Sequence, residues 1–68
     1  MKLTYDQETD AAYLCLVPSI ADGAVKKTVP INESLHLDYG DDGKLLGIEI
    51  LDASRLLDKK TLLEAEKA

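Results

Sequence analysis

An Asp-Gly pair, Asp42-Gly43, separates two runs of alternating apolar and polar residues and is the feature that most constrains the fold. Alternation with a period of two is typical of β-strands, and Asp-Gly between two such runs predicts a hairpin with a type I′ turn. The register that this turn imposes pairs Tyr39 with Leu46, Leu37 with Ile48 and Leu35 with Ile50. A one-residue slip would break this single apolar face, so the hydrophobic pattern supports the register independently of the turn.

Three further runs have strand character: Lys2–Tyr5, Ala11–Val17 and Ala24–Ile31. Pro30 cannot donate to a ladder, which places the third run at a sheet edge or the strand end. The sequence therefore predicts one α+β domain over residues 1–68 that is mostly antiparallel β. Its β-hairpin sheet, a meander of about five short strands, occupies residues 1–51.

The remaining residues, 52–68, predict a short helical tail with one or two helices. Asp52 is expected to cap the exit from the hairpin, and Asp58 is expected to be the N-cap of the last helix. Leu57 and Leu62 have the spacing of a hydrophobic staple around that cap. The final residues, 64–68, are expected to fray.

Charge and cysteine content exclude several classes of function. The net charge of −5, with only two lysine pairs, disfavours nucleic acid as a partner. No apolar run reaches the roughly 20 residues of a membrane span. A lone cysteine and the absence of a signal-peptide pattern indicate a cytoplasmic protein. One cysteine and one histidine allow no intrachain disulfide and no usual zinc set, so no cofactor is expected.

His36, Asp38 and Glu49 are the only residues with the look of an acid–base group. The hairpin register places His36 opposite Glu49 on the face away from the core, with Asp38 two residues along. A cross-strand charge pair is the simpler interpretation, since no nucleophile is near. A ligand or metal site built from these residues is the alternative, and no catalytic residue is assigned.

The acidic run Asp6, Glu8 and Asp10 resembles the start of a calcium loop, but Ala11 and Val17 stand where an EF-hand needs Gly and Glu. An Asx-type turn that joins two strands is the interpretation that remains.

The second strand is apolar on both faces, with Ala12, Leu14 and Leu16 on one side and a second set on the other. This second set, Tyr13, Cys15 and Val17, is a candidate interface. A single sheet with one helical tail covers only one face well, so the other face is predicted to be buried in a homodimer.

Several stretches together resemble the short prokaryotic proteins grouped as domain of unknown function 2283. They are Tyr5-Asp6, Asp10-Ala11-Ala12-Tyr13-Leu14, Leu37-Asp38-Tyr39 and the run from Gly43 to Ser54. The resemblance spans about residues 1–54, and the tail from Arg55 lies outside it. This chain differs from the family pattern in its longer Pro18–Gly23 connection and in Cys15, which stands where a charged or polar residue is common. The resemblance implies a small β-rich fold with no established activity and no catalytic residue.

The function stays unknown at this level, and two hypotheses compete. The leading one is a small non-enzymatic interaction module, either a homodimer or the acidic partner of a basic protein. Some members of the resembled family neighbour small toxin-like proteins, which implies an antitoxin-like function. The alternative is a small-ligand or metal-binding protein, or a minor enzyme, that uses His36, Asp38 and Glu49.

Overall fold

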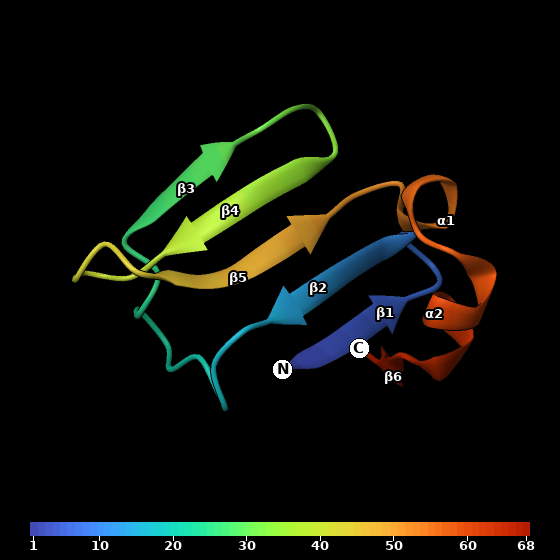
Figure 1. Ribbon diagram of the computed structural model, residues 1–68, viewed down its shortest axis with the longest axis horizontal. Coiled ribbons are helices and arrows are strands. Elements are labelled where there is room, and N and C mark those ends of the chain that lie inside the picture. The colour runs from blue at the N-terminus through green and yellow to red at the C-terminus, as the bar shows by residue number, and fades with distance from the viewer.

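One mixed sheet with two short helices at one end makes up the computed structural model, which describes residues 1–68 (Figure 1). In chain order the elements are β1 (Lys2–Asp6), β2 (Ala11–Cys15), β3 (Lys27–Pro30), β4 (Leu35–Tyr39), β5 (Leu45–Ile50), α1 (Ala53–Leu56), α2 (Lys59–Glu64) and β6 (Glu66–Lys67). The strand order is β3-β4-β5-β2-β1-β6, and only β1 and β6 are parallel. The predicted α+β class with a mostly antiparallel sheet is confirmed.

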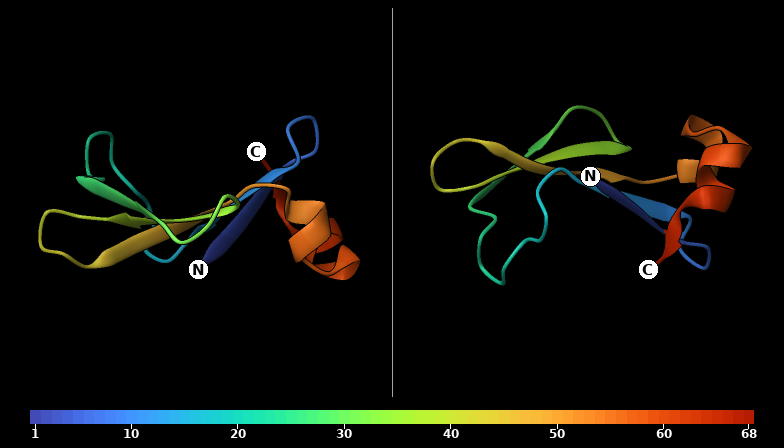
Figure 2. Two further views of the ribbon diagram at one scale, coloured as in Figure 1. Left: turned by 90° about the horizontal axis from the view of Figure 1, so that it is seen from above. Right: turned by 60° about the horizontal axis from the view of Figure 1, so that its bottom comes forward.

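β5 lies between β4 and β2, so the chain must cross from one side of the sheet to the other between β2 and β3. Residues 16–26 form this crossing, on the side of the sheet opposite the helices (Figure 2). β3 is shorter than its predicted run and is an edge strand, as Pro30 at its end requires. The two most apolar strands, β2 and β5, are the central pair, and each has a hydrogen-bonded neighbour on both of its edges.

The hairpin between β4 and β5 confirms most of the predicted register but not the turn. Leu35 pairs with Ile50 and Leu37 with Ile48, as predicted, whereas Tyr39 pairs with Leu45 across a bulge. Gly43 has φ of 77°, and Asp42 has no positive φ, so the predicted type I′ turn is wrong.

A three-residue loop, 41–43, replaces the two-residue turn. The N–H of Gly43 donates to the Gly40 carbonyl at 3.0 Å, and that of Gly40 donates to the Lys44 carbonyl at 2.9 Å. Such a loop needs positive φ only at its last residue, which a glycine adopts without strain. Asp42 therefore does not need the left-handed conformation. The loop has one residue more than the predicted turn, and the bulge beside Tyr39 restores the predicted register for the rest of the hairpin.

Two parallel rows of side chains run across the helix-bearing face of the sheet. The first, the covered row, consists of Tyr5, Ala12, Ile50 and Leu35. The second, the open row, consists of Leu14, Ile48, Leu37 and Val29, and Leu3 on β1 continues its line but packs against the core. Ala12, Ile50 and Ala53 are the only buried apolar residues, and they form a core under the helices at the covered row.

The helical tail has the two short helices, the Asp58 cap and the packed Leu57 and Leu62 that the sequence predicts. Asp58 caps α2, since its carboxylate accepts the N–H of Lys60 at 2.9 Å, and Leu57 and Leu62 both pack against the buried cluster. The predicted fraying at the end of the chain is wrong, because β6 pairs with β1 and the N–H of Ala68 donates to the Tyr5 carbonyl at 3.1 Å. Neither helix has the length or the apolar run that crossing a bilayer requires.

Candidate functional site

A chain of hydrogen bonds crosses four strands on the face opposite the helices. The hydroxyl of Tyr13 on β2 donates to Asp38 on β4 at 2.8 Å, and the hydroxyl of Thr28 on β3 donates to the same carboxylate at 2.6 Å. β5 lies between β2 and β4, so the Tyr13 side chain must pass over it. We call Tyr13, Asp38 and Thr28 the cross-sheet chain.

Gly47 on β5 provides the space for this passage. It pairs with Cys15 on one side and with Asp38 on the other. A Cβ atom built at this glycine would overlap the ring and hydroxyl of Tyr13. Burial under these neighbours and the hydrogen bond to Asp38 both raise the pKa of Tyr13. The phenol therefore stays protonated at neutral pH and acts as a donor.

His36 and Glu49 form the predicted pair on the same face, next to Asp38 and Gly47 in the direction of the helices. The Nδ1 atom of His36 lies 2.9 Å from the Oε1 atom of Glu49, and the residues are direct cross-strand partners. The side chain of His36 is 24% exposed and that of Glu49 is 46% exposed, so water reaches both. The geometry is that of a cross-strand pair at a wet surface.

The three residues predicted as an acid–base group do not converge on one point. Asp38 is engaged by Tyr13 and Thr28, while His36 is engaged by Glu49. No three His, Cys, Asp or Glu side chains gather in a way that would hold a metal ion. Each carboxylate of the trio already has a hydrogen-bond partner within the chain. Binding of a ligand or metal by these residues stays a prediction.

Of the predicted interface residues, Tyr13 and Cys15 lie on the same face as the cross-sheet chain, while Val17 lies beyond the end of β2. Tyr13 belongs to that chain, and the half-buried thiol of Cys15 donates to the carbonyl of Val17 at 3.1 Å. Tyr13 and Cys15 therefore have partners within the chain. Their burial by a second copy stays a prediction.

Asp10 is the polar residue that sequence reasoning undervalued. Its carboxylate accepts the Tyr5 hydroxyl at 2.7 Å, the Ser54 N–H at 2.9 Å and the Ser54 hydroxyl at 2.7 Å. Its carbonyl also accepts the N–H of Ala53 at 2.9 Å. These bonds satisfy the free N–H groups of Ala53 and Ser54 at the start of α1, as the side chain of an N-cap residue would. The β1–β2 turn therefore caps a helix that is distant in sequence.

Asp52, predicted to provide that cap, makes no side-chain capping bond and has φ of 52°. The predicted Asx turn is confirmed, since the N–H of Glu8 donates to Asp6 at 3.0 Å. The hydrogen bonds from Tyr5 and Ser54 lower the pKa of Asp10, and the same contact raises the pKa of Tyr5. The sequence carried one signal for this cluster, because Tyr5, Asp10 and Ser54 all lie in the stretches that resemble a family.

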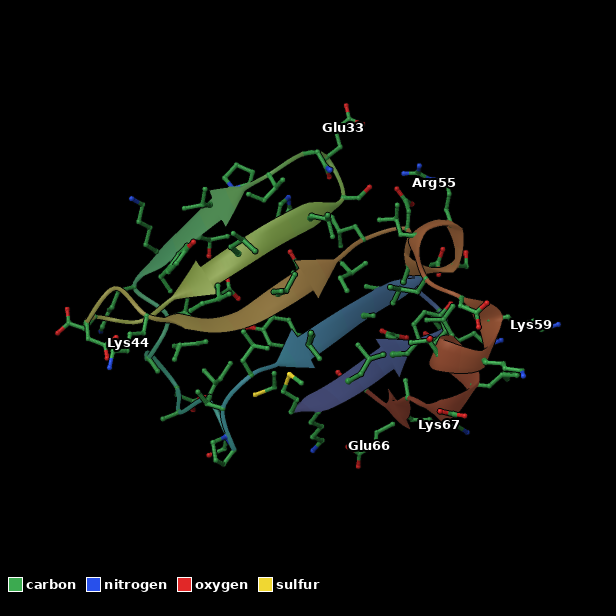
Figure 3. The ribbon with its side chains drawn as sticks, in the orientation of Figure 1. Glu33, Lys44, Arg55, Lys59, Glu66 and Lys67 are labelled. Atoms are coloured by element: carbon green, nitrogen blue, oxygen red, sulfur yellow. The ribbon has the colours of Figure 1, made fainter.

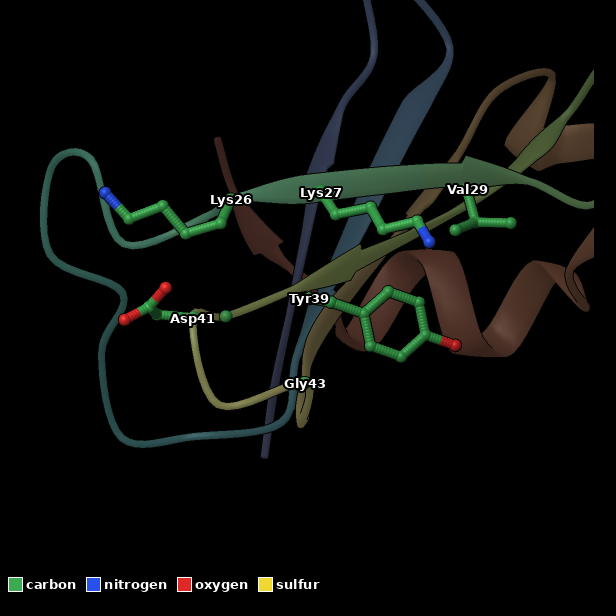
Figure 4. A pocket seen from close by; sticks show the side chains of 7 residues that line it. Lys26, Lys27, Val29, Tyr39, Asp41 and Gly43 are labelled. Carbon is green, nitrogen blue, oxygen red and sulfur yellow. The ribbon is translucent and has the colours of Figure 1, made fainter.

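A hollow of about 460 Å³ opens at the far end of the sheet from the helices (Figure 4). Its lining includes Lys26, Lys27, Val29, Tyr39 and Asp41. Val29 and Tyr39 lie on the helix-bearing face, where β3 pairs with β4. The hollow is therefore the end of that face, away from His36, Asp38 and Glu49.

The sequence pattern of one family, described as "Protein of unknown function (DUF2283)", matches residues 2–54. The chain belongs to the DUF2283 family. Comparison with curated proteins and with solved structures gives no match. The DUF2283 match ends at Ser54, the residue that closes the contact with Asp10, and it leaves out α2 and β6. The matched segment thus contains the whole cross-sheet chain and the whole Asp10 cluster.

Proposed function

We propose that this protein is a non-enzymatic protein-interaction module that works as a homodimer. The observation that carries the proposal is its surface area. The chain exposes 4990 Å², whereas a folded monomer of 7.4 kDa exposes about 4200 Å². The surplus of about 800 Å² equals what each partner buries in a standard interface.

A small core supports the same proposal. Ala12, Ile50 and Ala53 are the only buried apolar residues, and no large side chain is fully buried. Domains of this size gain stability from disulfides, metals or self-association. Cys15 is the only cysteine, which leaves self-association as the natural source. A lone free thiol also suits a reducing compartment, and we place the module in the cytoplasm.

Sedimentation equilibrium over a wide range of concentrations tests the proposal. We expect twice the chain mass at micromolar concentration and dissociation on dilution. The urea midpoint should also rise with protein concentration, because association stabilises the folded state by mass action. A chain that stays monomeric at high micromolar concentration, with a concentration-independent midpoint, would overturn the proposal.

The net charge of −5 supports a second candidate, which is pairing with a small basic protein in an antitoxin-like manner. Affinity purification from the native host, followed by mass spectrometry, tests this candidate. A co-encoded basic protein that is recovered in equal amounts and rebinds after purification would support it. Recovery of this chain alone would count against it.

A further inference from the structure

We propose that two copies of this chain pack face to face through the part of the helix-bearing face that the helices leave open. The proposal rests on the homodimer proposed above and adds which surface forms it. We define the open surface as the open row together with Tyr39, its neighbour towards the hollow. Its residues are Leu14, Ile48, Leu37, Val29 and Tyr39.

The open row is a continuous apolar strip across four strands. Leu14 pairs with Ile48, Ile48 with Leu37, and Leu37 with Val29. Strands lie about 4.8 Å apart, so the strip is about 14 Å long. All four side chains are only partly buried, and of the four only Ile48 packs against the core. Most of the strip therefore lies outside the core and keeps part of its surface in contact with solvent.

Charged groups stand at the border of this surface, where Lys27 lies beside Val29 and Tyr39 and lines the hollow (Figure 4). The labelled charged side chains in Figure 3, Glu33, Lys44, Arg55, Lys59, Glu66 and Lys67, project from the periphery of the molecule. None of the five residues of the open surface carries a charge. The opposite face, by contrast, presents Asp38, His36 and Glu49 from its central strands. Burial against that face would desolvate these groups, which favours the open surface as the interface.

The shape of the face favours a second copy over an unrelated partner. Both helices stand on this face at one end, while the other end is bare, so the surface has the form of a step (Figure 2). A two-fold rotation places the helices of each copy beyond the bare end of the other. A helix is about 10 Å in diameter, and facing sheets pack about 10 Å apart, so the two steps match in height. Such a surface is self-complementary, as a two-fold interface must be.

A charge placed on each face in turn tests the proposal. Leu37→Glu lies at the centre of the open surface, and Cys15→Glu is its control on the opposite face. Sedimentation equilibrium should show dimerisation weakened roughly 100-fold or more in Leu37→Glu. The change in Cys15→Glu should be less than about threefold. Circular dichroism checks whether both variants remain folded.

The outcomes separate this proposal from the one on which it rests. A monomeric parent chain would overturn both. A dimeric parent chain whose association survives Leu37→Glu would leave the homodimer intact and overturn the open surface as its interface. Loss of association in Cys15→Glu alone would assign the interface to the opposite face and overturn this proposal equally.

A cross-linking experiment gives an answer even if Leu37→Glu fails to fold. In a Cys15→Ala background, Leu37→Cys introduces a single thiol near the middle of the open surface. Because facing sheets lie about 10 Å apart, a short bifunctional maleimide, which spans that gap, should then produce a covalently linked dimer in high yield at low micromolar concentration. The control variant Thr28→Cys, in the same background, places its thiol on the opposite face. It is expected to give no cross-linked dimer. Equal yields from the two variants would overturn the proposal.

Discussion

The carboxylate of Asp10 holds Ser54, a residue 44 positions away, through the backbone N–H at 2.9 Å and the side-chain hydroxyl at 2.7 Å. Asp10 lies between β1 and β2, and Ser54 lies in the first turn of α1. The contact fixes the helices over the covered row, where Ala53 is fully buried beside Ala12 and Ile50. One polar contact thus decides which half of the sheet face is covered and which half stays open.

Replacement of Asp10 by alanine should lower stability and loosen α1. The Tyr5 hydroxyl and both Ser54 donors would lose their acceptor, and alanine tolerates the positive φ of this position poorly. The urea midpoint of Asp10→Ala, followed by circular dichroism, should fall clearly below that of the parent chain. Asp10→Asn, which keeps one acceptor oxygen and tolerates the backbone, should fall between them. An unchanged midpoint in Asp10→Ala would contradict the capping function.

Acid should weaken the fold partly through this same carboxylate. The pKa of Asp10 is lowered in the folded state from its ordinary value of 3.8, chiefly by the hydrogen bond from Tyr5. Its contribution to stability is therefore fully present above pH 3.8 and is lost as the pH falls through the lowered pKa. Urea midpoints measured from neutral pH down to strong acid should decline less steeply in Asp10→Asn than in the parent chain. Parallel curves would show that Asp10 does not titrate differently on folding.

Gly47→Ala should destabilise the fold by about 1–3 kcal/mol, because the new methyl group would overlap the ring of Tyr13. A double-mutant cycle with Tyr13→Val isolates this contact, since valine suits a strand and removes the ring. We expect Gly47→Ala to cost much less in the Tyr13→Val background. Equal costs in the two backgrounds would mean that the ring does not occupy the space above Gly47.

The pair of His36 and Glu49 should contribute at most about 1 kcal/mol, as exposed cross-strand pairs do. A double-mutant cycle with His36→Gln and Glu49→Gln, measured by urea unfolding at neutral pH, gives the coupling energy directly. The same variants should leave dimerisation unchanged, because both residues lie on the face away from the open surface. Tight metal binding that disappears in His36→Ala would instead support a binding site at these residues.

Local patterns in the sequence account for much of the fold. The alternation on either side of Asp42-Gly43 predicted the pairing of Leu37 with Ile48, because a strand's side chains change face at every residue. The same logic placed His36 opposite Glu49. The turn itself was misjudged, since Asp-Gly suits both a two-residue turn and the end of a three-residue loop. Only the backbone of the folded chain distinguishes the two.

The contacts that organise the candidate site are of a different kind. Tyr13 and Asp38 are 25 positions apart, and they meet only because β5 enters between β2 and β4 with a glycine at the crossing point. Strand order follows from how the apolar faces pack together, which no local spacing records. The pairing of β6 with β1 is similar, because an edge strand accepts a partner wherever the chain brings one.

The sequence by itself determined the strands, the hairpin pairing, the N-cap of α2 and the acidic character of this DUF2283 protein, because each depends on residues a few positions apart. Only the tertiary structure decided that Asp10 caps α1, that Tyr13 reaches Asp38, and that one half of the apolar face stays open. These features join distant segments, and the physical reason they form is burial and hydrogen bonding that exist only once the sheet is assembled.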